Sequence, residues 1–96
     1  MEEILAKVKL ALRITEDAFD SELTDLINAC ILDLGIAGVE HDEPLTNALI
    51  IRAICTYCKM HFGTPEEYER LKASYDEQKA QMSMATGYTT WTEATH

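Results

Sequence analysis

The feature that most constrains the fold is a segment that is apolar on nearly every side, residues 45–62. Its only charged or imidazole side chains are those of Arg52, Lys59 and His61. A helix with apolar residues around its whole circumference is stable only when other elements cover it. In a chain of 96 residues, whose own core is modest, neighbouring helices or another subunit must supply that cover. The sequence therefore predicts an all-α fold with a central hydrophobic helix.

Apolar spacing predicts two helices before this segment. The first spans about residues 2–12, and the second follows the clearest periodicity in the chain. Thr15 or Asp17 is the expected N-cap of the second helix, and Gly35 and Gly38 are expected to end it. Its apolar residues are Phe19, Leu23, Leu26, Ile27, Cys30, Ile31 and Leu34.

The central helix and the last helix both carry start signals. The central helix has a proline for its first turn and an acid near the cap, and the last has a capping threonine, a proline and a capping-box glutamate. These residues are Asp42, Glu43 and Pro44 in the first case and Thr64, Pro65 and Glu67 in the second. The last helix would run to Met82, with Tyr68, Leu71 and Tyr75 on its apolar face. Residues 1–82 are thus predicted to form a small antiparallel bundle of about four helices.

Residues 83–96 differ in character and are predicted to form an extended C-terminal arm. Thr, Gly and aromatic residues replace the helix formers, and the sequence has strand propensity without a partner strand in this chain. One interpretation is a frayed terminus. The other is a segment that adds to a partner's surface, because Trp and Tyr anchor interfaces. The candidate partner-binding residues are Met84, Gly87, Tyr88 and Trp91.

The chain is strongly acidic, with 17 Asp and Glu against 8 Lys and Arg and a formal net charge of −9. Eleven of the acids lie in residues 1–43, where only Lys7, Lys9 and Arg13 oppose them. Such a surface repels phosphate and argues against a protein that grips nucleic acid. Solubility is a sufficient explanation of this charge. The more specific interpretation is a surface that DNA passes without sticking to it.

One motif is typical of metal or redox chemistry: Cys55 and Cys58 in CxxC spacing, followed by His61. With Cys30 as a fourth ligand these side chains could hold zinc. The motif lies in the middle of the predicted central helix, however, without the helix start that activates such thiols. Buried thiols pack as small apolar side chains. We therefore expect core cysteines and no cofactor, and we keep a small metal-binding or redox protein as the alternative.

No pattern indicates an enzyme or a membrane protein. The four glycines are too scattered for a phosphate loop, and the histidines have no Ser or Asp placed for nucleophilic catalysis. Asp17, Asp20 and Glu22 suggest a metal cluster, but acids are ordinary at a helix start. No apolar run reaches the roughly 18–20 residues of a membrane span, and the acidic start of the chain is unlike a secretory signal.

A distinctive order of hydrophobic and capping signals runs through the chain. It comprises residues 12–23, the hydrophobic segment 45–63 with its Phe62-Gly63 end, and the predicted last helix followed by Gly87-Tyr88. This order resembles the small head–tail connector proteins of tailed double-stranded-DNA phages and prophages. The resemblance covers about residues 3–91. It rests on packing and capping patterns, and the CxxC cysteines are not part of it.

The resemblance implies an all-helical adaptor that assembles as a ring of about twelve subunits. It implies that the ring binds the portal protein, joins a downstream tail-completion or stopper protein, and lets DNA pass without sequence-specific binding. The protein would be made in the host cytoplasm and reside at the head–tail interface of the virion. The candidate channel-facing acids are Glu2, Glu3, Glu16, Asp17, Glu22 and Asp25.

A small phage-encoded helix-turn-helix regulator is the remaining alternative. Its recognition helix would carry a basic face toward DNA. No predicted helix of this chain has a stripe of Lys or Arg.

Overall fold

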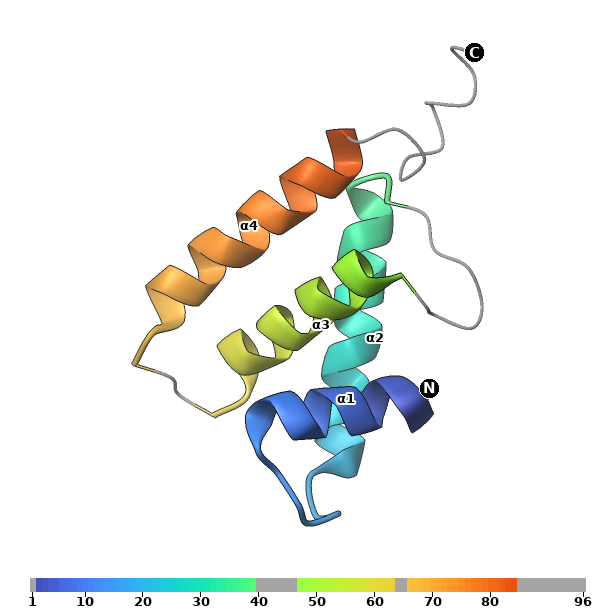
Figure 1. The fold of residues 1–96 in the computed structure, drawn as a ribbon, viewed down its shortest axis with the longest axis vertical. Helices are drawn as coiled ribbons and strands as arrows, with labels where there is room; N and C mark the ends of the chain where they lie inside the picture. The colour runs from blue at the N-terminus through green and yellow to red at the C-terminus, as the bar shows by residue number, and fades with distance from the viewer. Residues whose placement is uncertain (1, 40–46, 64–65, 85–96) are drawn as a thin grey trace.

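A computed structural model of the chain describes residues 2–39, 47–63 and 66–84. In these ranges it has four α-helices and no β-strand: α1 (Glu2–Leu12), α2 (Asp20–Ile36), α3 (Ala48–His61) and α4 (Tyr68–Met84). The predicted all-α fold is therefore confirmed for this part of the chain (Figure 1). Ser83 and Met84 belong to α4, beyond the limit expected from the sequence. Gly87, Tyr88 and Trp91 lie outside the described residues.

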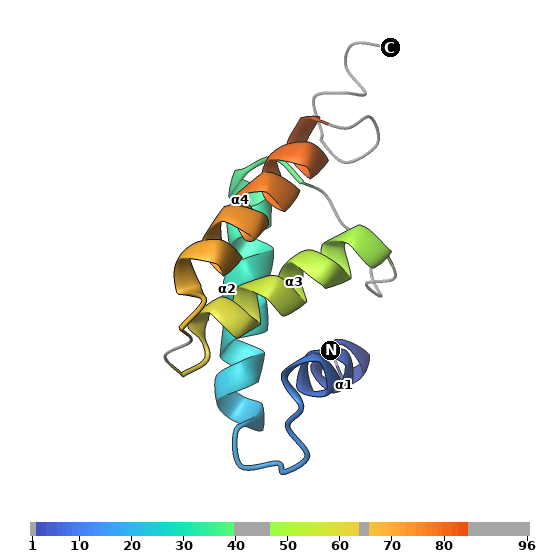
Figure 2. The ribbon, with the colours of Figure 1, turned by 60° about the vertical axis from the view of Figure 1, so that its left-hand side comes forward.

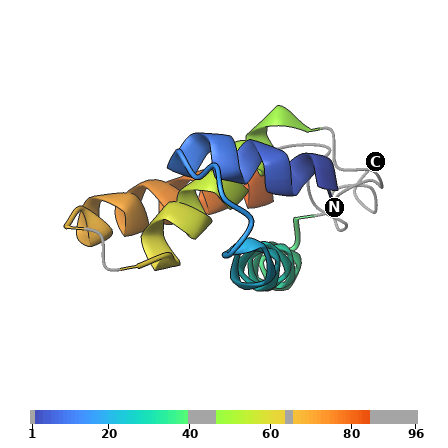
Figure 3. The same ribbon diagram turned by 90° about the horizontal axis from the view of Figure 1, so that it is seen from below.

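The central position of α3 is confirmed, because α3 packs against α1, α2 and α4. α3 and α4 run side by side in opposite directions, and α1 crosses near the lower end of α3 (Figure 1). When the molecule is turned, α3 and α4 pass in front of α2 (Figure 2). Seen from below, α2 is viewed nearly end-on, and α1 crosses in front of α3 (Figure 3).

The core is a cluster of buried side chains drawn from all four helices. The predicted apolar face of α2 is confirmed at Leu23, Ile27, Cys30 and Leu34, which are all buried. A fully buried aliphatic side chain of this size contributes about 1.5–3 kcal/mol through the hydrophobic effect. The other core residues are Ile4, Val8, Val39, Ile50, Ala53, Ile54, Cys58, Met60, Tyr75 and Met82.

The start of α2 differs from the expectation. Neither Thr15 nor Asp17 caps this helix; its N-cap is Phe19, which makes no side-chain cap hydrogen bond. The Asp17 carboxylate instead accepts a hydrogen bond from Lys9 Nζ at 2.8 Å. The same ammonium lies 2.8 Å from Asp20 Oδ1. Because Lys9 holds the Asp17 carboxylate toward α1, this carboxylate does not satisfy the first amides of α2.

The start of α3 also differs from the expectation of a helix that begins near Pro44. The residue before Ala48 is Asn47, whose backbone is extended. Its Oδ1 accepts hydrogen bonds from the backbone N–H of Leu49 at 2.9 Å and of Ile50 at 3.2 Å. Two amides of the first turn are satisfied in this way. The expected cap residues Asp42, Glu43 and Pro44 lie outside the described residues.

Two further helix boundaries are shifted. Gly35 lies inside α2, and the chain turns at Gly38, whose φ of 89° is free of strain only for glycine. α4 begins at Tyr68, so Glu67 precedes the helix and does not complete a capping box. Its carboxylate contacts Arg70 at 2.6 Å instead. The expected cap and first residue of this helix, Thr64 and Pro65, lie outside the described residues.

Candidate assembly surfaces

The three cysteines are free thiols in or beside the core. Cys30 and Cys58 are fully buried, and Cys55 is half-buried. Burial raises the pKa of Cys30 and of Cys58 to about 12, and it also raises the pKa of Cys55. A thiol that stays protonated is a poor metal ligand and a poor nucleophile. These positions favour the packing interpretation of the CxxC motif.

His61 does not join the cysteines in a ligand set. It is exposed at the end of α3, where its ring lies against Tyr57 and Tyr68, with ring centroids 4.4 Å and 6.2 Å away. Within the described ranges, no three His, Cys, Asp or Glu side chains come together as a metal site. The sequence also suggests a metal cluster at Asp17, Asp20 and Glu22. Asp17 and Asp20 both contact the ammonium of Lys9 instead.

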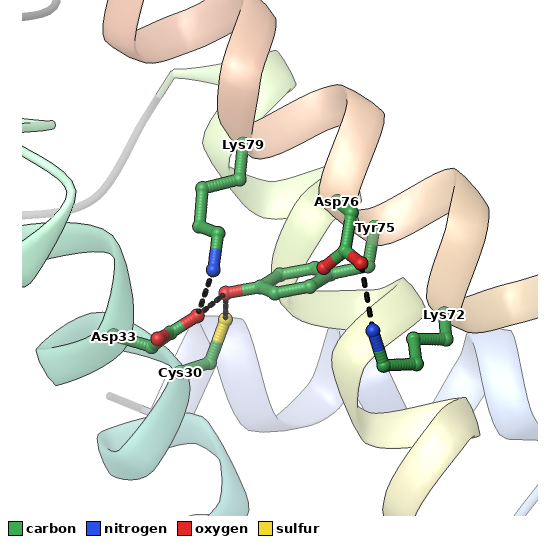
Figure 4. Close-up of polar contacts among 6 residues, drawn as sticks. All are labelled: Cys30, Asp33, Lys72, Tyr75, Asp76 and Lys79. Carbon is green, nitrogen blue, oxygen red and sulfur yellow. Dashed lines mark hydrogen bonds and ion pairs between the residues drawn. The ribbon is translucent and has the colours of Figure 1, made fainter.

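A polar cluster joins α2 to α4 (Figure 4). The Tyr75 hydroxyl donates a hydrogen bond to Asp33 Oδ2 at 2.7 Å, and Lys79 Nζ donates to the same oxygen at 3.1 Å. Cys30 Sγ lies 3.6 Å from the Tyr75 hydroxyl. Hydrogen bonds to an ionised carboxylate are about twice as strong as neutral ones. The cluster therefore fixes α4 to the second half of α2.

The ionisation of the cluster follows from its surroundings. Burial favours a higher pKa for Asp33, but hydrogen bonds from Tyr75 and Lys79 outweigh it and hold the pKa below its usual value. Burial, together with the hydrogen bonds to Asp33 and Cys30, raises the pKa of Tyr75. At neutral pH the carboxylate is charged and the phenol is not, so the donor and acceptor roles are fixed. The arrangement serves as a structural joint.

The six candidate channel acids are all exposed, and they come from three parts of the chain. Glu2 and Glu3 begin α1, Glu16 and Asp17 lie in the connection to α2, and Glu22 and Asp25 lie in the first half of α2. Asp17 is paired with Lys9. The other five have no ion pair with any residue in the described ranges.

Exposed apolar side chains occur at the end of the molecule where α2 and α4 finish near one another (Figures 1 and 2). Leu32 and Ile36 on α2 are 70% and 87% exposed, and Met84 at the end of α4 is 82% exposed. Large exposed apolar patches mark sites of protein contact, so these side chains are candidates for such a site. Met84 was among the candidates from the sequence. Leu32 and Ile36 were missed, although their spacing of four, off the buried face of α2, is a signal that could have found them.

The proteins that this chain resembles indicate the role of these surfaces. No described helix is long and apolar enough to cross a membrane. No curated protein and no solved structure matches the chain. A family described as phage connector protein has a model that matches residues 4–89, a span that includes α2, α3, α4 and most of α1. The chain therefore belongs to the phage connector protein family, a structural family of the head–tail joint of the virion.

Proposed function

We propose that this protein is the subunit of a ring-shaped adaptor that binds the portal protein and connects the phage head to the tail. The observation that carries the proposal is the family match over residues 4–89. A ring of about twelve copies suits a small chain with exposed apolar residues, because oligomeric contacts cover surface that one chain cannot bury. A downstream tail-completion or stopper protein would bind the opposite side of the ring.

The acidic charge supports a passage for DNA through the ring. A net charge of −9 on each subunit, repeated around a ring, gives a channel that repels phosphate. DNA would then move through without being held, because binding to phosphates requires cations that displace its counterions. The acids proposed to line this channel are drawn from Glu2, Glu3, Glu16, Asp17, Glu22 and Asp25, all exposed.

The portal-binding surface is proposed at the end where α2 and α4 finish. Leu32, Ile36 and Met84 are exposed there, and the chain continues from Met84 into the predicted arm with Tyr88 and Trp91. Apolar and aromatic side chains of this kind supply most of the binding energy in protein interfaces. The assembled protein would reside in the virion after its synthesis in the host cytoplasm.

The decisive experiment measures the mass of the purified protein by native mass spectrometry, alone and with the portal protein, and inspects the mixture by negative-stain electron microscopy. We expect annular particles and a complex of many subunits with the portal. A protein that remains a monomer under both conditions would overturn the proposal.

The portal-binding role of the arm is tested with a Tyr88→Ala/Trp91→Ala variant. We expect portal binding to fall by about ten-fold or more, because aromatic anchors dominate interfaces, while circular dichroism stays unchanged. Thr89→Ala/Thr90→Ala in the same segment is the matched control and should bind normally. Full binding by the aromatic variant would remove the arm from the portal interface.

A further inference from the structure

A trough opens on the surface between α1 and α4, with α3 as its floor. In Figure 2, α3 crosses between α4 and α1, and α2 lies behind it. The larger half of the trough has a volume of about 610 Å³. Its lining includes Leu12 and Arg13 of α1 and the adjoining turn, Arg52, Lys59 and Phe62 of α3 and the following residue, and Glu67, Arg70 and Leu71 at the start of α4.

This half of the trough is basic, although the chain is acidic. Arg13, Arg52, Lys59 and Arg70 are four of the eight Lys and Arg residues in the sequence. Arg70 is paired with Glu67. The other three have no ion pair within residues 2–39, 47–63 and 66–84. Three unpaired cations that face one hollow form a local positive potential for an acidic partner.

The backbone at Arg13 supports a role for its side chain. Arg13 has a φ of 60°, in the left-handed region, which is unfavourable for residues other than glycine. It ends α1 with backbone hydrogen bonds from Arg13 N to Leu10 O at 3.1 Å and from Ile14 N to Lys9 O at 2.8 Å. Glycine is the usual residue at such a helix end. An arginine placed here at a conformational cost contributes its cation to the trough.

The trough continues between α3 and α4 and becomes less charged. Arg52 and Gln78 line both halves, and the second half also contains Leu49, Gln81 and Met82. Leu49 is 51% exposed. The trough is therefore basic toward Arg13 and partly apolar toward Leu49.

The outward face of α2 has the complementary order of side chains. Glu22 and Asp25 are exposed in the first half of the helix, and Leu32 and Ile36 are exposed in the second half. The stretch from Glu22 to Ile36 is about 21 Å long at the rise of an α-helix. The lining of the trough includes no residue of α2, and α2 lies behind α3 in Figure 2.

We propose that the trough of one copy binds the outward face of α2 from a second copy. Glu22 and Asp25 contact the basic half, and Leu32 and Ile36 cover the half that contains Leu49. This inference rests on the proposed ring and supplies its subunit contact. Because the two surfaces lie on opposite sides of one chain, the contact is head-to-tail, the kind that closes into a ring. It removes Glu22 and Asp25 from the channel and leaves the acids of residues 2–17 to line it. It also assigns Leu32 and Ile36 to the subunit contact, so Met84 and the predicted arm remain as the portal-binding surface.

Charge reversal in the trough tests this contact. The Arg52→Glu/Lys59→Glu variant should lower the association constant about ten-fold or more, because like charges across an interface are strongly unfavourable. Both residues are exposed and unpaired among the described residues, so circular dichroism should be unchanged. Lys7→Glu/Lys72→Glu changes the net charge equally on exposed lysines outside the trough; it also breaks the exposed ion pair of Lys72 with Asp76, which contributes little to stability. That control should associate like the unmodified protein.

The reciprocal variant, Glu22→Lys/Asp25→Lys, should lose association to a similar degree. Mixing it with Arg52→Glu/Lys59→Glu should restore rings, because alternating copies then place opposite charges at every contact. Arg13→Gly supplies a separate readout. Glycine suits the backbone at this position, so thermal stability should stay level or rise while association weakens.

Association is read by native mass spectrometry and, when rings form only on the portal, by the yield of annular particles. If the unmodified protein forms rings and both charge variants form them equally well, the proposed contact is wrong, but the proposed ring assembly is supported. Failure of the mixture to restore rings likewise refutes the pairing of these two surfaces. If the unmodified protein forms no ring alone or on the portal, the proposed function itself fails.

Discussion

The two ends of α2 are held by contacts of different kinds. Near its C-terminal end, Asp33 accepts hydrogen bonds from Tyr75 and Lys79 of α4, and Tyr75 is only 2% exposed. At its N-terminal end, Lys9 of α1 bridges Asp17 and Asp20, and the three side chains are 14%, 89% and 36% exposed. This contact is made by charged side chains alone. The distances at both ends are similar, but the surroundings are not. A polar contact that includes a buried aromatic side chain should stabilise the fold far more than one made by charged side chains alone.

The largest effect is expected from Tyr75→Ala. The substitution removes a buried ring that packs edge-on to Tyr57, with centroids 5.3 Å apart, and leaves Asp33 with Lys79 alone. The free energy of unfolding should fall by about 3–5 kcal/mol, as for other large aromatic truncations in cores. Urea denaturation followed by circular dichroism measures the loss.

Tyr68→Ala on the same helix is the control for this measurement. Tyr68 is 36% exposed, so its removal should have a much smaller effect. Similar losses from both tyrosines would show that burial at the α2–α4 joint is not the source of its strength.

A smaller effect is expected from Asp33→Asn, which should cost about 1 kcal/mol at neutral pH through weaker hydrogen bonds. The folded pKa of Asp33 lies below its ordinary value of 3.8, so the unfolded chain takes up this proton first as the pH falls. The stabilisation is therefore present above the ordinary value and is lost below it. The stability gap between the unmodified protein and the variant should narrow in acid.

Chemical denaturation at several pH values from neutral to acid tests this dependence. Asp25→Asn, at an exposed position on the same helix, is the matched control and should track the unmodified protein. A gap that stays constant in acid would mean that the charge of Asp33 does not stabilise the joint.

The helices could be predicted from the sequence because the spacing of apolar residues along a helix depends only on neighbouring positions. The buried stripe of α2 and the central position of α3 followed from it directly. The caps were harder to predict, because several residues compete at each helix start. Asp17 has the right chemistry to cap α2, but Lys9, eight residues earlier, binds its carboxylate. Asn47 caps α3, whereas Pro44 predicts an earlier start of that helix.

The surfaces depend on distant residues and could not be predicted in the same way. Asp33 and Tyr75 are 42 residues apart, and no spacing rule connects them. The sequence places at most two Lys or Arg residues on one face of any helix. Arg13, Arg52 and Arg70 nevertheless meet in one trough, because α1 and α4 both pack on α3. A local search along one helix misses a charge cluster that packing assembles from three.

The smallest effect is expected from Lys9→Met, which keeps the apolar stem of the side chain and removes its charge. The partner Asp17 is 89% exposed, and an ion pair with one side open to solvent loses much of its attraction to screening and side-chain entropy. The change in unfolding free energy should therefore be below that of Asp33→Asn. Hydrogen bonding to Lys9 lowers the pKa of Asp17, and the variant should return this pKa toward its ordinary value in an NMR titration. Added salt should shrink the remaining stability difference. A loss as large as that from Tyr75→Ala would instead show that the two ends of α2 are equally strong, and that the buried tyrosine does not distinguish them.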